Sequence, residues 1–330
     1  IIFKYYIIIM TKTIFINLKP NKESSSNGGG NYFVMNLDKY LSQNKFKIVY
    51  ELQDNIDLIF MIDPRKNPAF NKNYGLEDIM DYKKNNPNVK IIYRVNENDI
   101  KREKSINIEP ILVKTMKSVD YVVFVSEWLK NYFVDKYKLN IKCCSIINGC
   151  NSNDFYYDKD KHNKNIKNKK IKLVTHHHSS NYLKGFHIYN EIDKLLENNN
   201  EIEFTYIGNY HKDYKPKNIK LLPSANGKEL GDLLRSHDIY LTATQYEPGA
   251  MHYVEGLSCG LPVLYSINGG GAHEVCKTAG EEYNDIKSMF SKLNEIKNNY
   301  DQYVSQIDYN YLSSKRCCED YFKLINNIIL

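Results

Sequence analysis

Residues 238–274 read DIYLTATQYEPGAMHYVEGLSCGLPVLYSINGGGAHE, and this stretch decides the fold. Pro248 and Gly249 permit a tight turn close to a ligand, and the start of a following helix offers unpaired N–H groups to an anion or to hydroxyls. The pattern predicts a strand, a polar loop, a helix and a second strand, with the regular elements at residues 239–241, 251–258 and 262–265.

Outside this stretch, short apolar strands alternate with amphipathic helices along the chain. Strands of this kind indicate parallel sheets that are covered on both faces. In the first half, we place strands at 13–18, 56–62, 89–93, 121–125 and 145–147, and helices at 32–41, 76–84, 111–118 and 127–136. In the second half, we place further strands at 171–175, 203–207 and 219–222, helices at 185–196 and 227–237, and two helices after residue 285.

The alternation predicts an α/β protein with two doubly wound, Rossmann-like domains that face a central cleft, where ligands bind at the carboxyl ends of the strands. We expect an N-terminal domain over residues 1–155, with residues 1–10 outside the fold. A basic linker over 156–170 connects it to a second domain over 171–310, and a helix follows at 311–330.

Composition limits the possible functions. Hydrophobic residues make up 42% and charged residues 25% of the 330-residue chain, which is typical of globular proteins. The longest apolar run, residues 1–10, is shorter than the roughly 20 residues of a spanning helix, so we predict no membrane span and leave peripheral association open. A net charge of +6 suits anionic ligands but is too small for a dedicated nucleic-acid binder. Seven cysteines, an odd number without CxxC spacing, predict reduced thiols and a cytoplasmic protein.

Several short motifs follow one another along the chain. They are Gly28-Gly29-Gly30, VSEWL at 125–129, INGCN at 147–151, Lys184-Gly185, RSHD at 235–238, and the paired Glu247 and Glu255 followed by CGLPV at 259–263. One glycine cluster alone is a weak signal, but the order and spacing of the whole set are specific. Together they resemble the glycosyltransferase group 1 family of retaining, nucleotide-sugar-dependent transferases, which have the GT-B fold.

The resemblance implies roles for the residues around the paired glutamates. Glu247 would contact the transferred sugar and support charge at its anomeric centre, and Lys184 would neutralise the leaving diphosphate. Glu255 would accept hydrogen bonds from the ribose. Other donor-binding residues would act through their backbone, and these are Gly249, Ala250, Met251, Gly29 and Gly30. The resemblance also implies that the first domain is on the acceptor side and that the domain at 171–310 binds the nucleotide-sugar donor. It further implies that the helix at 311–330 crosses back to the first domain, although packing on the second would leave the same pattern.

One segment departs from the family pattern. The family places an Arg several residues before Lys184, whereas residues 175–183 read THHHSSNYL. His178, Ser179 or Asn181 would then supply hydrogen bonds to the donor phosphates instead. The adjacent histidines also suggest a metal site, but neighbouring residues on a strand point to opposite faces, so we expect no metal.

A second polar cluster follows a strand of the first domain, where residues 93–99 read YRVNEND. Side chains at the carboxyl end of such a strand face the expected cleft. Arg94 would bind a phosphate or a sugar acid there, and Asn96 would bind hydroxyls. Residues 93–99 would equally suit a solvated loop with local turns. A structural role is also open for Glu255, because a carboxylate in a first helical turn stabilises the helix without any ligand.

The sequence therefore predicts a retaining, metal-independent glycosyltransferase of the hexosyltransferase type, without a cofactor, that moves a sugar from a nucleotide-diphosphate sugar to an acceptor hydroxyl. The acceptor is a glycan, a lipid, a protein or a small molecule, and no nucleic acid is expected as a partner. Two alternatives stay open. One is another GT-B enzyme, such as a nucleotide-sugar epimerase or a phosphorylase, and the other is a non-catalytic nucleotide-sugar-binding protein, which the missing Arg favours.

Overall fold

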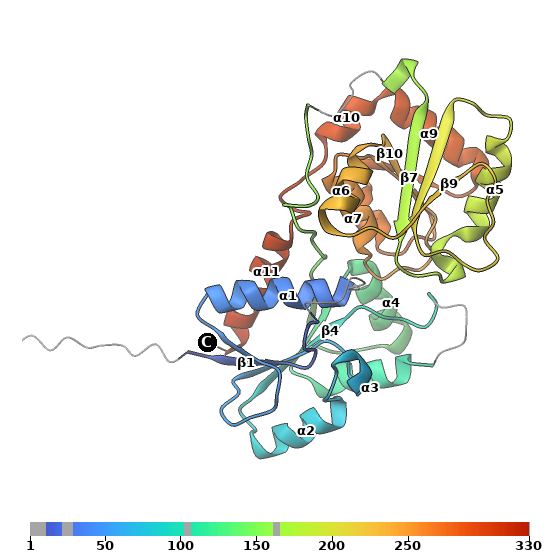
Figure 1. Cartoon of the computed structure of the whole chain (residues 1–330). Helices are drawn as coiled ribbons and strands as arrows, with labels where there is room; N and C mark the ends of the chain where they lie inside the picture. Colours follow the sequence, from blue (N-terminus) through green and yellow to red (C-terminus); the bar gives the residue numbers. More distant parts are fainter. Residues whose placement is uncertain (1–10, 22–28, 102–106, 161–165, 330) are drawn as a thin grey trace, which may run out of the picture.

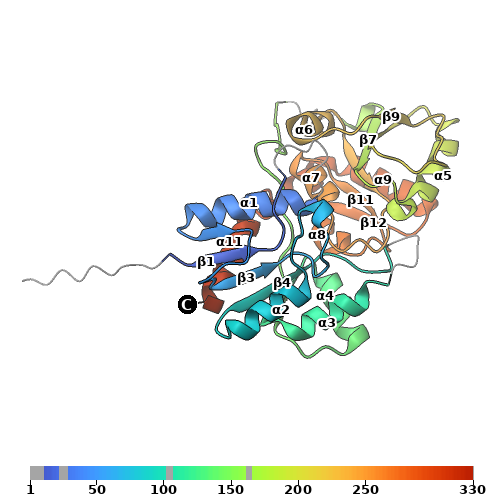
Figure 2. The same ribbon diagram turned by 60° about the horizontal axis from the view of Figure 1, so that its bottom comes forward.

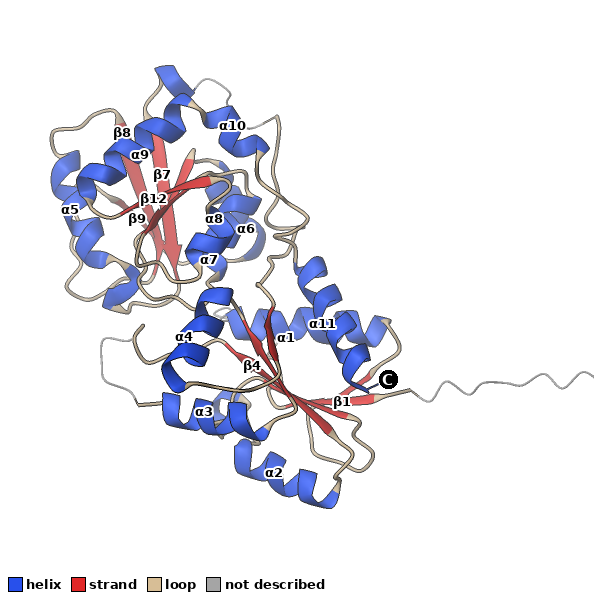
Figure 3. Cartoon of the chain, turned by 180° about the vertical axis from the view of Figure 1, so that it is seen from behind, coloured by secondary structure: helices blue, strands red, loops and turns tan. Residues whose placement is uncertain are grey.

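The computed structural model describes residues 11–21, 29–101, 107–160 and 166–329 (Figure 1). The chain forms two six-stranded sheets in which neighbouring strands run parallel, with helices around each sheet (Figure 3). The prediction of an α/β protein with two doubly wound domains is therefore confirmed. Three expectations lie outside the described residues, namely those for residues 1–10, for Gly28 and for the middle of the basic linker.

The first sheet has the strand order β2-β1-β3-β4-β5-β6. The sequences of β1 and β3, TIFI and LIFM, are buried at every position because helices cover both faces of the sheet. The strands are β1 (Thr13–Ile16), β2 (Lys47–Val49), β3 (Leu58–Met61), β4 (Lys90–Val95), β5 (Tyr121–Phe124) and β6 (Cys143–Ser145). One face packs on α2 (Leu76–Asn85), α3 (Glu109–Ser118) and α4 (Glu127–Tyr137), and the other on α1 (Gly29–Gln43) and α11 (Ser314–Ile329) (Figure 2). A 3-10 helix, η1 (Pro68–Phe70), precedes α2.

The C-terminal helix α11 packs beside α1 on the first domain (Figures 1 and 3). Its Tyr321 ring meets the Phe33 ring of α1 edge to face, with centroids 5.1 Å apart. Where the chain enters α11, the Cys150 N–H donates to the Leu312 carbonyl at 2.9 Å. A Cβ atom on Gly149 would lie 2.1 Å from the Ser313 carbonyl oxygen, so only glycine allows this approach.

The second sheet has the strand order β12-β11-β10-β7-β8-β9. Its order reverses between β7 and β10, and in sheets of this type ligands bind at that point, outside the carboxyl ends of the two strands. The strands are β7 (Ile171–His177), β8 (Ile202–Gly208), β9 (Lys220–Leu222), β10 (Ile239–Thr242), β11 (Val263–Ser266) and β12 (Gly280–Tyr283).

Two groups of helices cover the second sheet, and each group contributes to its own hydrophobic cluster. One group comprises α5 (Phe186–Leu196), α9 (Ile286–Asn298) and α10 (Tyr300–Ser305), and the other α6 (Gly227–Arg235), α7 (Met251–Ser258) and α8 (Ala272–Cys276). Two 3-10 helices, η2 (Ile166–Asn168) and η3 (Tyr182–Lys184), flank β7. No helix among residues 11–21, 29–101, 107–160 and 166–329 is long and apolar enough to cross a bilayer.

The structure differs from the sequence-based element assignment in several places. The edge strands β2 and β12 and the five-residue helix α8 were not predicted, because KIV and GEEY are short, partly exposed and show no apolar alternation. β6 begins two residues before the predicted strand at 145–147. Three helices, α9, α10 and α11, follow residue 285 where two were predicted. The seven cysteines are all free thiols.

Candidate active site

A cavity of about 480 Å³ lies between the two domains, within the size range of small-ligand sites. The second domain contributes the loops that follow β7 and β10, and the first contributes the start of α1 and the end of β4. The structure brings the predicted site residues other than Asn181 to this cleft: Gly29, Gly30, Arg94, Asn96, His178, Ser179, Lys184, Glu247, Gly249, Ala250, Met251 and Glu255.

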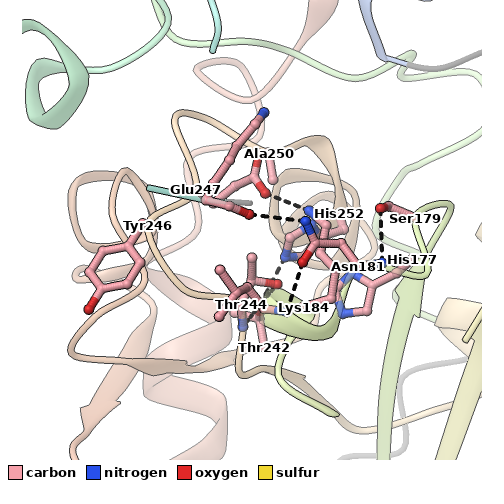
Figure 4. A network of polar contacts seen from close by, with 12 residues as sticks. His177, Ser179, Asn181, Lys184, Thr242, Thr244, Tyr246, Glu247, Ala250 and His252 are labelled. Atoms are coloured by element: carbon pink, nitrogen blue, oxygen red, sulfur yellow. Dashed lines mark hydrogen bonds and ion pairs between the residues drawn. The ribbon is translucent and has the colours of Figure 1, made fainter. Parts of the chain in front are cut away.

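Glu247 and Lys184 form an ion pair on the second-domain wall of the cleft (Figure 4). Lys184 Nζ lies 2.5 Å from Glu247 Oε2, and the two side chains are 19% and 11% exposed. Burial alone would raise the pKa of Glu247, but the charges of Lys184 and Lys101 lower this pKa to about 2. Glu247 is therefore an ionised carboxylate at neutral pH, held beside a cation in a largely dry site.

A turn of three glycines fixes the backbone of Glu247. The preceding Tyr246 has a φ of +53°, which is uncommon for a residue with a side chain, and its ring points away from the ion pair (Figure 4). The Gly271 N–H donates to the Glu247 carbonyl at 2.9 Å. A Cβ atom on Gly270, whose φ is +69°, would lie 2.4 Å from that same carbonyl oxygen. Only glycine fits at position 270 without displacing the Glu247 backbone.

Glu255 is held by a histidine from the neighbouring strand. Its Oε2 lies 2.7 Å from His176 Nε2, and the Tyr240 hydroxyl lies 3.1 Å from His176 Nδ1. A carboxylate oxygen accepts hydrogen bonds, so His176 Nε2 carries the proton of its contact with Glu255. The Tyr240 hydroxyl accepts the His176 backbone N–H at 3.1 Å. Glu255 lies in the second turn of α7, and its sequence-based assignment to a first helical turn is wrong. Stabilisation of a carboxylate by the helix N-terminus therefore does not account for a glutamate at position 255.

His177 and His252 form a buried pair beside these groups. Their rings meet edge to face with centroids 4.7 Å apart. Burial, assisted by nearby positive charge, lowers the pKa of each well below its ordinary value, so both are neutral. Each ring also contacts a hydroxyl: His177 Nε2 lies 3.0 Å from Tyr189, and His252 Nε2 lies 2.9 Å from Thr242.

The adjacent histidines are used separately. His176 contacts Glu255, His177 contacts Tyr189, and His178 is exposed on the cleft wall. Across the part of the chain that the structure describes, no group of three or more His, Cys, Asp or Glu side chains is placed to hold a metal ion.

Among the residues predicted to replace the missing Arg, Asn181 is already engaged. Its amide nitrogen donates to the Lys101 carbonyl at 3.1 Å, and its oxygen accepts the Leu183 N–H at 2.9 Å. The Ser179 hydroxyl accepts the Asn181 N–H at 3.2 Å. Ser179 and His178 lie exposed on the cleft, whereas Asn181 shapes the loop that leads to Lys184.

The start of α7 lies against the first domain. A Cβ atom on Gly249 would lie 2.7 Å from the Val125 carbonyl oxygen of the first domain, so the approach requires glycine. The Ala250 N–H, which the resemblance assigned to a ligand, donates to the Tyr253 hydroxyl at 2.9 Å. This donor is therefore engaged within the protein, while Met251 lines the cleft at the first position of the helix.

On the first-domain wall, Arg94 is only 2% exposed. Its guanidinium stacks 4.0 Å over the Phe33 ring centroid, and Nη2 donates to Asn148 Oδ1 at 2.8 Å. The Asn148 amide in turn donates to the Gly249 carbonyl of the second domain at 2.8 Å. Asn148 thus connects Arg94 to the loop of the paired glutamates, and Asn96 lies half-buried on the same wall.

Further hydrogen bonds hold the domains together around the cleft. The Asn98 amide donates to the Tyr246 carbonyl at 3.1 Å. The Glu127 N–H at the start of α4 donates to the Glu274 carboxylate at 3.0 Å. The contacts of Asn98 and Asn148 involve the carbonyl groups of Tyr246 and Gly249, on either side of Glu247, so the position of the first domain affects the geometry of the ion pair.

Three residues of the site were not identified from the sequence. Lys101 lines the cleft, lowers the Glu247 pKa and pairs with Glu97 at 3.2 Å, but a lysine in a polar loop gives no signal. Asn148 belongs to the INGCN motif, which contributed to the family resemblance without giving this residue a role. His252 lies inside the glutamate motif, where a buried histidine is indistinguishable from a core residue.

Comparison with known proteins fits this geometry. Residues 158–312 match the family described as glycosyl transferases group 1. This part of the chain belongs to the glycosyl transferases group 1 family. The group 1 region carries Lys184, Glu247 and Glu255, while the first-domain wall lies outside the match. A probable sucrose-phosphate synthase from Thermosipho melanesiensis is 27% identical over 230 residues, which is 62% of this chain and 52% of that protein. The chain therefore spans about half the length of this curated relative.

Solved structures extend the likeness to both domains. A sucrose-phosphate synthase from Thermosynechococcus elongatus has a TM-score of 0.69 at 10% identity, covering 96% of this chain and 99% of that one. HepE from Anabaena, solved with UDP and glucose, has a TM-score of 0.66 at 15% identity, covering 96% and 100%. The group 1 region and the first domain together have the GT-B fold, as the resemblance implied.

Proposed function

We propose that this protein is a retaining glycosyltransferase of the hexosyltransferase type, which transfers a sugar from a nucleotide-diphosphate sugar to an acceptor hydroxyl. The observation that supports it best is the Glu247–Lys184 ion pair, which lies with Glu255 on one wall of a cleft closed by a second domain. Membership of residues 158–312 in the group 1 family adds to this support.

In the proposed mechanism, the ionised Glu247 carboxylate stabilises the positive charge that develops at the anomeric carbon. Lys184 has three N–H donors, so it keeps its bond to Glu247 while another donor reaches the leaving diphosphate. The acceptor oxygen bonds to the anomeric carbon on the face from which the diphosphate oxygen departs. The electron pair of the broken bond and the acceptor proton both pass to the diphosphate, so no side-chain base is required.

Glu255 binds the ribose hydroxyls in this proposal. His176 supports it, because its Nε2–H donor and the Tyr240 hydroxyl fix the carboxylate and the imidazole in one orientation. Uridine diphosphate sugars are the first donors to test, since HepE was solved with UDP-glucose and the pneumococcal O-GlcNAc transferase GtfA with UDP. No metal ligand set and no cofactor enter the proposal.

The direct test combines binding and turnover. Thermal unfolding is measured with UDP-, GDP- and ADP-sugars, because a ligand that binds only the native state raises its stability by mass action. The bound donor is then offered glycan, lipid and small-molecule acceptors, and NMR identifies the anomer of the product. A product with inverted configuration would contradict the retaining mechanism.

The same assay separates the alternatives. A changed sugar after incubation with donor alone would indicate an epimerase, and turnover that requires inorganic phosphate would indicate a phosphorylase. Nucleotide-sugar binding with neither hydrolysis nor transfer across the acceptor panel would indicate a binding protein. Each of these outcomes contradicts the proposed transferase.

A further inference from the structure

Arg94 differs from the other arginines among the described residues. Arg65 pairs with Asp63 at 2.8 Å, Arg235 with Asp232 at 2.7 Å and Arg316 with Asp320 at 3.0 Å. Within the described part of the chain, no carboxylate lies within ion-pair distance of Arg94, although it is 2% exposed. Its charge is therefore buried without a counter-ion among the described residues.

The hydrogen-bonding capacity of Arg94 is also largely unused. A guanidinium has five N–H donors, and the three on Nε and Nη1 have no partner among the described residues. Nη2 donates to Asn148, and the stacked Phe33 ring covers one face. The Tyr321 hydroxyl lies near the guanidinium, outside the geometry of a regular hydrogen bond, and as a neutral group it supplies no counter-charge.

A buried, unpaired guanidinium is unfavourable, because its lost hydration is not replaced. A water molecule could satisfy a donor, but it could not neutralise the charge. Arg94 nevertheless lines the cleft, together with Gly29, Gly30 and Asn96 at the mouth of the first domain. The other cations of the cleft have partners, since Lys184 pairs with Glu247 and Lys101 with Glu97. An anionic ligand bound at this wall would therefore supply the negative charge and the hydrogen-bond acceptors that Arg94 lacks among the described residues.

We propose that the acceptor of this enzyme carries an anionic group, a phosphate or a carboxylate, and that Arg94 binds this group with Asn148 holding the guanidinium in place. This inference rests on the proposed function and names the acceptor class of the same cleft. It gives the first-domain wall a role that the group 1 match does not cover, because residues 158–312 exclude Arg94.

The first experiment tests the anion site without an acceptor. Saturating UDP occupies the diphosphate site, and the melting temperature is then compared in potassium phosphate and in potassium chloride of equal ionic strength. Phosphate should raise the melting temperature of the wild type and of Arg65→Gln more than that of Arg94→Met. Acetate in place of phosphate identifies which anion the site prefers. An equal response of Arg94→Met would overturn the proposal.

The stability of Arg94→Met gives an independent reading. Replacing an unpaired buried charge by an apolar side chain of similar length should leave the melting temperature unchanged or raise it. An arginine that serves only to hold the fold predicts the opposite, a lower melting temperature with no change in acceptor preference. Arg94→Lys, which keeps the charge and loses the planar donors, should retain part of the phosphate response.

The second experiment measures acceptor choice. Release of UDP from UDP-glucose is followed with glucose, glucose 6-phosphate and glucuronate as matched acceptors. The wild type should prefer an anionic member, and Arg94→Met should raise the KM for it roughly tenfold to a hundredfold, as expected for hydrogen bonds to a charged group. The KM for glucose should change less. Arg65→Gln should behave as the wild type.

The outcomes separate this inference from the proposed function. A wild type that binds UDP but shows neither a phosphate response dependent on Arg94 nor a preference for anionic acceptors overturns the anionic-acceptor proposal alone. A protein that binds phosphate through Arg94 but no nucleoside diphosphate overturns the transferase proposal and keeps the anion site.

Discussion

The two walls of the cleft differ in how their charged side chains are paired. On the second-domain wall, Lys184 and Glu247 pair with each other, and Glu255 pairs with His176. On the first-domain wall, Arg94 is buried without a carboxylate partner among the described residues. The second-domain wall is complete before any ligand arrives, whereas the first-domain wall becomes complete only when a ligand supplies negative charge.

The difference indicates how the work is divided between the domains. A preformed ionic network costs no reorganisation when charge develops during a reaction, which suits the wall that carries the chemistry. An uncompensated cation lowers stability but gains affinity and selectivity when its ligand binds, which suits the wall that chooses the acceptor. The following substitutions test whether the walls differ in this way.

The largest effect is expected from Lys184→Met, which breaks the second-domain network. The Glu247 carboxylate would stay buried without its cation, so the free energy of unfolding should fall by about 3–5 kcal/mol at neutral pH, measured by urea denaturation. Lys66→Met is the matched control, because Lys66 pairs with Asp78 at the surface. That change should cost less than about 1 kcal/mol. Equal losses in the two variants would contradict the description of the second wall.

The same pair predicts a pH dependence. The pKa of Glu247 is about 2 in the folded protein and 4.5 ordinarily. A lowered pKa contributes stability that is fully present above pH 4.5 and is lost as the pH falls toward 2. The stability difference between wild type and Lys184→Met should therefore shrink over this interval, which denaturation at a series of pH values measures.

Glu247→Gln keeps the shape of the side chain and removes its charge. The rate of sugar transfer should fall roughly 100- to 1000-fold, because the charge at the anomeric carbon loses its stabilising carboxylate. Glu282→Gln, which alters a carboxylate paired with His273 on the edge strand β12, should transfer at the wild-type rate. Turnover of Glu247→Gln within a few-fold of the wild type would refute the assigned role.

Gly270→Ala acts on Glu247 through its backbone. The new Cβ atom would lie 2.4 Å from the Glu247 carbonyl oxygen at a φ of +69°, so we expect a stability loss of about 2 kcal/mol and a transfer rate reduced about tenfold. Gly227→Ala also has a positive φ, +53°, but its Cβ atom would meet nothing closer than 3.7 Å. For each variant, the loss of transfer rate is compared with the loss of unfolding free energy. The same ratio in both variants would show that the glycine turn does not position Glu247.

The smallest effect is expected from Gly30→Ala on the first-domain wall. A Cβ atom there would meet nothing within 4 Å, and alanine in helix α1 should stabilise the protein by about 0.5–1 kcal/mol. If a ligand approaches this backbone, the affinity for a nucleotide sugar should nevertheless fall a few-fold, which calorimetry measures. Unchanged affinity would show that Gly30 lies beside the ligand site rather than in contact with it.

The motifs made the second-domain wall largely predictable from sequence. Glu247, Lys184 and Glu255 lie within short segments whose spacing fixes their strands and helices, and parallel-sheet topology then brings the segments to one edge. The fold class followed from the same alternation. The edge strands β2 and β12 did not, because a short, half-exposed strand has no hydrophobic pattern of its own.

The state of each side chain was not predictable. Arg94 was assigned to the cleft correctly, but its missing counter-ion depends on which residues of α1, of the loop after β6 and of α11 lie around it, and no local pattern encodes that. Lys101 reaches Glu247 across the domain boundary, and Asn181 is engaged with the Lys101 backbone. Such pairings arise from the meeting of two surfaces that are distant in sequence.

The return of α11 to the first domain means that the polypeptide passes between the domains twice, before β7 and after α10. The two passages touch, since the Cys150 N–H donates to the Leu312 carbonyl and the Ser314 N–H to the Cys150 carbonyl. Two adjoining tethers resist twisting and sliding far more than a single tether would. We therefore expect any relative motion of the two domains to be a rotation about the point where these passages meet, near residues 150 and 313, rather than a sliding of one domain along the other.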